Sequence, residues 1–403
     1  MDDLQQMTMN SSEDFHRNEN GWQNSVIIIP ALLSGSTLIV IAIILWKSIR
    51  RKRRDKRKRA KDKTNDFPLD WAVNAAGVYE NSLETLDPVV EKKQLPIEWS
   101  VERREVLCDG HFGPISRAVL CCSEKTQDGQ HVILKELSEH CSPGEVQDFI
   151  DLLKFYVQVC NHDNLVKMLW CQTERRPPSV IMEAMSYGDL LTFLRNSRQG
   201  VQAADGASPR ITERNVYAIS SQVASGLEYL SEMHNLVHGY VAACNVLIHE
   251  DLSVQLCGLG LAAIQYRTGS VPARRAAQVP LKWQSPERLK GSDITEKSDV
   301  WSFGILLYEM MTLGSPPYPD VDPSQLPSKL QKNYRMEQPP QCGPRLYEVM
   351  SSCWQWEALL RPCFTDVVKQ LQNATEQADG LTPVTAGDTL SWSEYLRVAG
   401  IPS

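Results

Sequence analysis

The most prominent feature of the hydrophobic pattern is an uninterrupted apolar stretch near the start of the chain. Residues 26–46 contain no charged side chain. A helix of these 21 residues, rising 1.5 Å per residue, spans the roughly 30 Å of a bilayer's hydrocarbon core. Trp22 and Trp46 lie near its two ends, where interfacial aromatic residues are enriched. The pattern therefore predicts one transmembrane helix, with a buried core helix as the alternative.

The charges on either side of this stretch predict its orientation. Residues 1–25 are polar and acidic and lack the basic start and apolar core of a signal peptide. Residues 47–63 hold twelve Lys and Arg against two Asp, a local charge of +10. Because cations remain on the cytoplasmic side, we expect a short extracellular segment, with Asn10 as a glycosylation candidate, and a cytosolic remainder of the chain at the plasma membrane.

The basic run over residues 47–63 also suits contact with anionic lipid of the inner leaflet, although it can serve as a topology signal alone. The net charge of the whole chain is −7, which leaves −17 for the rest and gives no indication of nucleic-acid binding. All eleven cysteines lie from Cys108 onward, without a C-x-x-C pair or a zinc spacing. They predict free thiols in a reducing compartment.

After a basic juxtamembrane linker over residues 47–98, the pattern becomes that of a globular domain. It is rich in strands first and in helices afterwards, which predicts an α+β fold of two lobes. A tail over residues 373–403 follows the last amphipathic helix. Strands are expected over 101–120, 131–137 and 179–183. Helices are expected over 143–160, over 189–196 before a loop at 197–210, and through most of the domain after 212.

Two stretches of the strand-rich half carry residues suited to binding a nucleotide. Gly110 and Gly113 lie in a turn, where glycines let backbone amides approach phosphate groups. Lys135 ends the apolar strand Val132–Lys135 and presents one cation to the phosphates. Each motif alone is a weak signal, because an ordinary hairpin turn and a surface lysine look the same. Their order along the chain is what favours the nucleotide interpretation.

The helical half contains three further motifs. Residues 237–245 read Val-His-Gly-Tyr-Val-Ala-Ala-Cys-Asn and are similar to the catalytic loop V-H-R-D-L-A-A-R-N. Residues 258–260 read Gly-Leu-Gly and stand at the position of the D-F-G motif that follows such a loop. Residues 280–287 read Pro-Leu-Lys-Trp-Gln-Ser-Pro-Glu and are similar to the motif P-[VI]-K-W-x-[AS]-P-E. With the glycine turn and Lys135, these ordered motifs resemble the receptor-like protein tyrosine kinase family over about residues 99–372.

The resemblance implies a two-lobed protein-kinase-like fold, with an N-lobe over residues 99–183 and a C-lobe over residues 184–372. It also implies that Glu287 pairs with Arg361 and that Asp299 ties down the catalytic loop, all three as structural residues. The nucleotide-binding residues that it implies are Leu107, Gly110, Gly113, Ile115, Lys135, Met182, Glu183 and Met185.

The chain departs from this family where the chemistry takes place. Tyr240 stands at the position of the Asp that accepts the substrate proton, and a phenol with a pKa near 10 is a poor base. Gly258 replaces the Asp that is the main Mg²⁺ ligand, whereas Asn245, the second ligand, is kept. The alternative is that another acid, such as Glu250 or Asp251, takes the place of the missing ligand.

Two neighbouring segments also differ from an active kinase. The helix over residues 143–160 has Leu152 or Leu153 in the register of the Glu that normally pairs with Lys135, and its nearest acid is Asp151. We therefore expect this helix in an outward, inactive position. The activation loop over residues 265–279 is short and basic, and we expect it to be solvated, with a site for an acidic partner as the alternative. Candidate phosphotyrosines are Tyr79, Tyr266 and Tyr395, of which Tyr79 is followed at +2 by an Asn, as in sites read by some SH2 adaptors.

The family implies ATP-dependent transfer to protein tyrosine and growth-promoting signalling, and the two lost carboxylates predict that this activity is impaired. We expect at most weak ATP binding and no dependable Mg²⁺ site. The favoured interpretation is a membrane-anchored pseudokinase that acts as a scaffold or allosteric partner of signalling proteins and other kinases. The alternatives are an unconventional, slow tyrosine kinase and a lipid-tethered adaptor that recruits SH2 domains.

Overall fold

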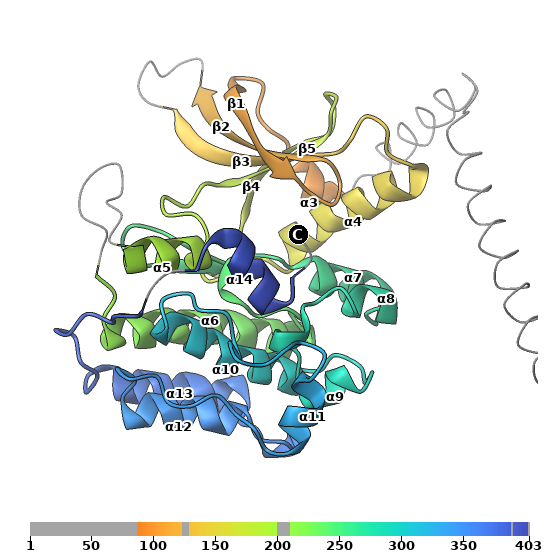
Figure 1. Ribbon diagram of the computed structural model, residues 1–403. Helices are drawn as coiled ribbons and strands as arrows, with labels where there is room; N and C mark the ends of the chain where they lie inside the picture. Colours follow the sequence, from red (N-terminus) through yellow and green to blue (C-terminus); the bar gives the residue numbers. More distant parts are fainter. Residues whose placement is uncertain (1–86, 123–128, 200–209, 388–389, 402–403) are drawn as a thin grey trace, which may run out of the picture. The chain divides into compact units, whose positions relative to one another are not determined.

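The computed structural model describes residues 87–122, 129–199, 210–387 and 390–401 (Figure 1). The apolar stretch over residues 26–46, the basic run over residues 47–63, the sequon at Asn10 and Tyr79 lie outside these ranges. Within them, no helix combines the length and the apolar character needed to cross a membrane.

The first lobe contains a five-stranded antiparallel sheet in the order β1-β2-β3-β5-β4. The segment over residues 101–120, predicted to be extended, folds as two strands joined by the turn that contains Gly110 and Gly113. The fourth strand was not predicted from the sequence. The strands are β1 (Trp99–Asp109), β2 (Pro114–Cys122), β3 (Gln130–Glu136), β4 (Met168–Gln172) and β5 (Ser179–Glu183).

The alternation of side chains along β3 determines where Lys135 points. Val132 and Leu134 are fully buried in a small cluster on one face of the sheet. Ile133 packs against the main core on the other face. Lys135, two residues after Ile133, therefore also faces the second lobe.

Helix α4 (Pro143–Gln158) packs beside the sheet (Figure 1). Its start is fixed by a capping box, in which the Ser142 hydroxyl accepts from the Glu145 amide and the Glu145 carboxylate accepts from the Ser142 amide. Phe149 and Leu153 bury the apolar face of the helix. The helix closely matches the predicted range of residues 143–160.

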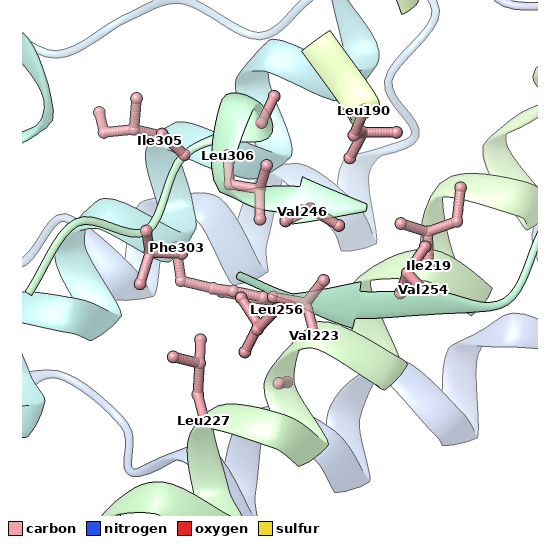
Figure 2. Packing of buried hydrophobic residues seen from close by; sticks show 14 of the residues in the cluster. Leu190, Ile219, Val223, Leu227, Val246, Val254, Leu256, Phe303, Ile305 and Leu306 are labelled. Atoms are coloured by element: carbon pink, nitrogen blue, oxygen red, sulfur yellow. The ribbon is translucent and has the colours of Figure 1, made fainter. Parts of the chain in front are cut away.

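The second lobe is mainly helical and confirms the predicted two-lobed α+β fold. In its centre, Val223 and Leu227 of α6 pack with Leu256 of β7 and with Phe303 and Leu306 of α10 (Figure 2). Val241, Ala242 and Ala243 of the catalytic loop belong to the same core. The larger elements are α5 (Leu190–Gln199), α6 (Glu213–His234), β6 (Val246–Ile248), β7 (Val254–Leu256), α10 (Glu296–Met311), α12 (Pro344–Cys353) and α13 (Phe364–Thr375).

Short elements complete the described chain. Before the sheet, α3 buries Val90 in the main core, so part of the predicted linker packs onto the domain. The short elements are α3 (Pro88–Glu91), η1 (Ala243–Asn245), η2 (Leu281–Trp283), α9 (Pro286–Leu289), α11 (Leu326–Gln331) and η3 (Ala358–Leu360).

Two segments for which the sequence predicted no helix, the activation loop and the C-terminal tail, are partly helical. The activation segment forms α7 (Gly260–Thr268) and α8 (Ala273–Ala276) rather than a loop, and most of residues 265–279 are exposed, as expected of a solvated segment. The C-terminal tail forms α14 (Trp392–Ala399), which buries Tyr395 completely. Helices α7 and α14 both contact distant parts of the chain. Such contacts cannot be predicted from the local periodicity of the sequence.

Candidate functional site

A cavity of about 770 Å³ lies between the glycine turn, α4, α7 and the catalytic loop. It brings together seven of the residues predicted from the sequence. Its lining does not include Leu107, Met182, Glu183 or Met185. The seven predicted residues that line it are Gly110, Gly113, Ile115, Lys135, Tyr240, Asn245 and Gly258.

Lys135 faces a tyrosine of α4. Its Nζ lies 5.9 Å from the ring centroid of Tyr156, and among the described residues no ion pair includes Lys135. Burial raises the pKa of Tyr156 above its ordinary value, so the phenol is neutral at physiological pH. Asp151, the nearest acid predicted from the sequence, contacts Lys154 at 3.9 Å and Arg267 at 3.8 Å instead.

The acids of α4 are held by the activation segment. Arg267 of α7 forms an ion pair with Asp148 and lies near Asp151. Tyr266 donates a hydrogen bond to the side chain of Gln158, and its ring lies 5.8 Å from that of Phe155. These contacts join α7 to α4 in the absence of an ion pair between α4 and Lys135.

The glycine turn also packs onto α4. The ring of Phe112 meets that of Phe149 edge-on, with 5.5 Å between the centroids. The Gly110 amide donates to the Gly113 carbonyl at 2.7 Å. Gly113 has a φ of 151°, and a Cβ there would lie 2.7 Å from the Glu136 carbonyl oxygen. The turn therefore needs glycine at Gly113 for its own packing, whether or not a phosphate binds.

The catalytic loop is held by two buried acidic side chains of α10. Asp299 accepts from the amides of His238 at 2.7 Å and Gly239 at 2.8 Å. Glu309 Oε2 accepts from the Ala243 amide at 3.0 Å and from Trp283 Nε1 at 3.1 Å. The backbone of the loop therefore has a defined shape even though its base is missing.

Tyr240 is part of the packing of this loop. The Cys244 thiol donates to its hydroxyl at 3.7 Å, and its ring meets Trp283 edge-on at 6.2 Å. Burial raises the pKa of the Tyr240 phenol far above its ordinary value. Tyr240 therefore remains protonated and cannot accept a proton from a substrate hydroxyl at neutral pH.

The residues around Gly258 do not fit a Mg²⁺ ion. Asn245 donates through Nδ2 to the Tyr240 carbonyl at 3.0 Å. Its Oδ1 would lie only 2.5 Å from a Cβ atom added at Gly258, so it occupies the space of any side chain at that position. The exposed carboxylate of Asp251 accepts from the Ser253 amide at 2.8 Å. The described part of the chain contains no group of three His, Cys, Asp or Glu able to hold a metal. Mg²⁺ in nucleotide sites is usually held by one or two protein carboxylates together with water and phosphates. Among Asn245, Asp251 and Gly258, only Asp251 carries a carboxylate, and it is bonded to Ser253.

Two of the structural residues expected in the C-lobe, Glu287 and Arg361, form an ion pair. Arg361 binds both oxygens of Glu287, at 2.7 and 2.8 Å, and its side chain is fully buried. Its guanidinium also lies 5.1 Å from the ring of Trp301. Bidentate and stacked contacts of this kind need arginine rather than lysine.

The C-terminal helix α14 was missed in the sequence and lies on the same lobe. Tyr395 stacks on Trp392 with 5.3 Å between the rings, and the guanidinium of Arg195 lies 4.9 Å from Tyr395. Arg195 also donates to the Leu390 carbonyl at 2.6 Å. The helix had a sequence signal in its Ser391 N-cap and in the apolar residues Trp392, Tyr395 and Ala399. The hydroxyl of Tyr395 is buried, so a phosphorylating enzyme does not reach it while α14 is docked.

The arrangement of a sheet lobe, a helical lobe and a catalytic loop between them defines a protein kinase domain. Residues 101–371 match the family model described as protein tyrosine and serine/threonine kinase. The chain therefore belongs to this family, as its motifs predicted.

Among individual proteins, the chain is similar to two named Tyrosine-protein kinase STYK1. That of Homo sapiens is 38% identical over 392 residues, which cover 94% of this chain and 92% of the relative. That of Mus musculus is 37% identical over 393 residues, which cover 94% and 91%. Tyrosine-protein kinase Abl of Drosophila melanogaster is 34% identical over 288 residues, which cover 70% of this chain and 17% of that protein.

The crowding at Gly258 predicts that this position tolerates no side chain. Gly258→Ala combines a φ of 74° with a Cβ only 2.5 Å from Asn245, and we expect it to lower the free energy of unfolding by about 1–3 kcal/mol in urea titration. Gly260→Ala is the matched control, because its Cβ meets nothing within 4 Å. Equal urea midpoints for the two variants would contradict the crowding, and Gly258→Asp should not create Mg²⁺ binding.

The buried Glu309 predicts a dependence of stability on pH. Burial raises the pKa of this carboxyl to about 8, so the folded protein keeps a proton that the unfolded chain has released above its ordinary pKa of 4.5. The folded state binds more protons between these values, and stability therefore falls as pH rises, by up to about 1.4 kcal/mol per pH unit. Glu309→Gln should flatten this fall between pH 5 and 8, measured by urea unfolding at several pH values. An unchanged slope would show that Glu309 is ionised in the folded protein.

Proposed function

We propose that this protein is a membrane-anchored signalling protein of the tyrosine kinase family in which phosphoryl transfer is impaired. In this proposal, the kinase-like domain acts as a scaffold or allosteric partner of other kinases in growth-promoting pathways. The observation that carries it is a contrast between the backbone of the site and its side chains. Asp299 and Glu309 hold the backbone of the catalytic loop, while neither Tyr240 nor Gly258 provides the carboxylate that chemistry needs.

Two physical effects support a low rate of transfer. A positioned general base contributes roughly 10²–10⁴ in rate, and Tyr240 is a protonated, buried phenol. The family's metal ions neutralise charge that develops on the phosphates, and the surroundings of Asn245 and Gly258 do not fit such an ion. These effects act on different parts of the reaction, so their costs combine.

The position of α4 supports the same conclusion. In an active kinase, a Glu of this helix holds the ATP lysine, whereas Lys135 lies beside the neutral Tyr156 and the α4 acids are held by Arg267. Nucleotide binding under these conditions is expected to be weak and insensitive to Mg²⁺. The retained Glu287–Arg361 pair supports a C-lobe that serves as a docking platform.

Impaired transfer is tested with radiolabelled ATP and a tyrosine-containing polymer. We expect the full-length protein to show a rate at least about 10²-fold below the 1–100 s⁻¹ that is typical of kinases. Any residual incorporation should be the same in Lys135→Ala, since it would come from contaminating enzymes. Phosphotyrosine formation that depends on Lys135 would favour the slow-kinase alternative and exclude the pseudokinase proposal.

The membrane anchor is proposed from the apolar stretch over residues 26–46 and the basic run that follows it, with an extracellular N-terminus at the plasma membrane. We expect the full chain to remain in the membrane pellet after alkaline washing. Leu38→Arg with Val40→Arg should release it, because each central Arg costs about 2.5–3.5 kcal/mol of insertion free energy. Thr64→Arg with Asn65→Arg, outside the stretch, is the matched control. Retention of the first double variant would argue against a spanning helix.

A further inference from the structure

The cavity beside Lys135 has a chemistry that a nucleotide does not explain. We propose that it is a binding site for an amphipathic organic anion, a small molecule with one carboxylate-type head on an apolar body, held without a metal ion. This inference does not depend on whether the chain transfers phosphate.

The size and walls of the cavity fit such a ligand. Its volume of about 770 Å³ lies in the range of small-molecule pockets, which are mostly apolar with a few polar groups. The sheet lobe contributes Ile115 and Phe112 to the wall, and α4 contributes Leu152. Further apolar side chains come from the activation segment: Leu259, Leu261, Ile264 and Val279.

The acids that line the cavity are already paired. Glu136 binds Arg104 at 2.7 Å. Asp148 and Asp151 both interact with Arg267. These carboxylates therefore do not neutralise any further cation at the cavity wall.

Two cations on the cavity wall have no carboxylate partner among the described contacts. Lys135 lies against the neutral Tyr156, and Arg275 contacts the ring of His111 at 3.2 Å. Both side chains are partly buried, and a bound anion would supply the counterion that neither has among these contacts. The unpaired charge of the wall is therefore positive, next to an apolar surface, which is the combination that an amphipathic anion matches.

A nucleotide fits this cavity less well. The residues expected to contact the base, Met182, Glu183 and Met185, do not line it. A triphosphate carries several negative charges, which kinases neutralise with metal ions, and the surroundings of Gly258 do not fit a metal. A single negative charge is compensated by Lys135 and Arg275 alone.

Occupancy of the cavity is linked to the arrangement of the domain. Its walls come from both α4 and α7, which are joined by Arg267. A ligand that contacts both helices binds this arrangement more tightly than one in which they separate, and it therefore shifts the population towards the joined state. The ligand would act as a regulator of the shape that the domain presents to its partners.

The test uses the full-length chain in lipid nanodiscs and two fluorescent probes of similar shape. Dansylglycine carries a carboxylate and dansylamide is neutral, and empty nanodiscs provide the blank for both. We expect dansylglycine to bind about tenfold more tightly than dansylamide, measured by the rise in fluorescence. Lys135→Met should weaken dansylglycine about tenfold and leave dansylamide unchanged, while Lys332→Met, at an exposed lysine of the C-lobe, should change neither.

Further variants locate the probe and guard against misfolding. Ile264→Trp fills the cavity and should abolish binding of both probes, and Ala263→Leu is a smaller filling change in the same wall. Arg275→Gln should weaken dansylglycine twofold to fivefold. Equal binding of the two probes, or full binding in both filling variants, overturns the proposal. Displacement of dansylglycine by adenosine also overturns it, since adenosine is uncharged and would identify the base pocket as the site.

Discussion

The attachment of the catalytic loop to the buried helix α10 is the constraint on which the rest of the site depends. Asp299 accepts two consecutive backbone amides, from His238 and Gly239, and Glu309 accepts from Ala243 and from the Trp283 indole. Buried acidic side chains are costly unless they are hydrogen-bonded, and here three of the four donors are backbone amides of the loop that they position. The loop can therefore keep its shape independently of any catalytic residue.

This independence explains how the chain can keep a kinase fold with Tyr240 and Gly258 at two positions where the family has aspartates. Tyr240 fills its position by packing on Trp283 and accepting from Cys244. Asn245 has turned its amide to the Tyr240 carbonyl, and the space beside it suits only glycine at position 258. Asn245 therefore lies between Tyr240 and Gly258 and is in contact with the surroundings of both. The Glu287–Arg361 pair and the α10 core, which lie away from the cavity, retain their contacts.

The structure differs from the sequence-based expectations mainly in the segments around the cavity. An outward position of α4 was expected because Leu152 or Leu153 stands where the family has a Glu. The residues that contact Lys135 and the α4 acids in the absence of this Glu were not predicted. Arg267 pairs with Asp148 over a separation of 119 residues, and Tyr156 lies against Lys135. The activation segment is mostly exposed, as its basic residues predicted, and Arg267 of this segment has an acidic partner on α4. A pattern of charge indicates that a cation needs a partner, but it does not say which distant residue supplies one.

The sequence by itself determined the family, the order of the two lobes and the positions of the catalytic replacements. These depend on local periodicity and on ordered motifs, both of which can be read along a single chain. Only the tertiary structure decided that α14 buries Tyr395 against Arg195, that α7 joins α4, and that Lys135 faces a phenol rather than a carboxylate. Each of these depends on which surfaces meet across long separations, because short amphipathic helices gain most of their stability from the partner they pack against.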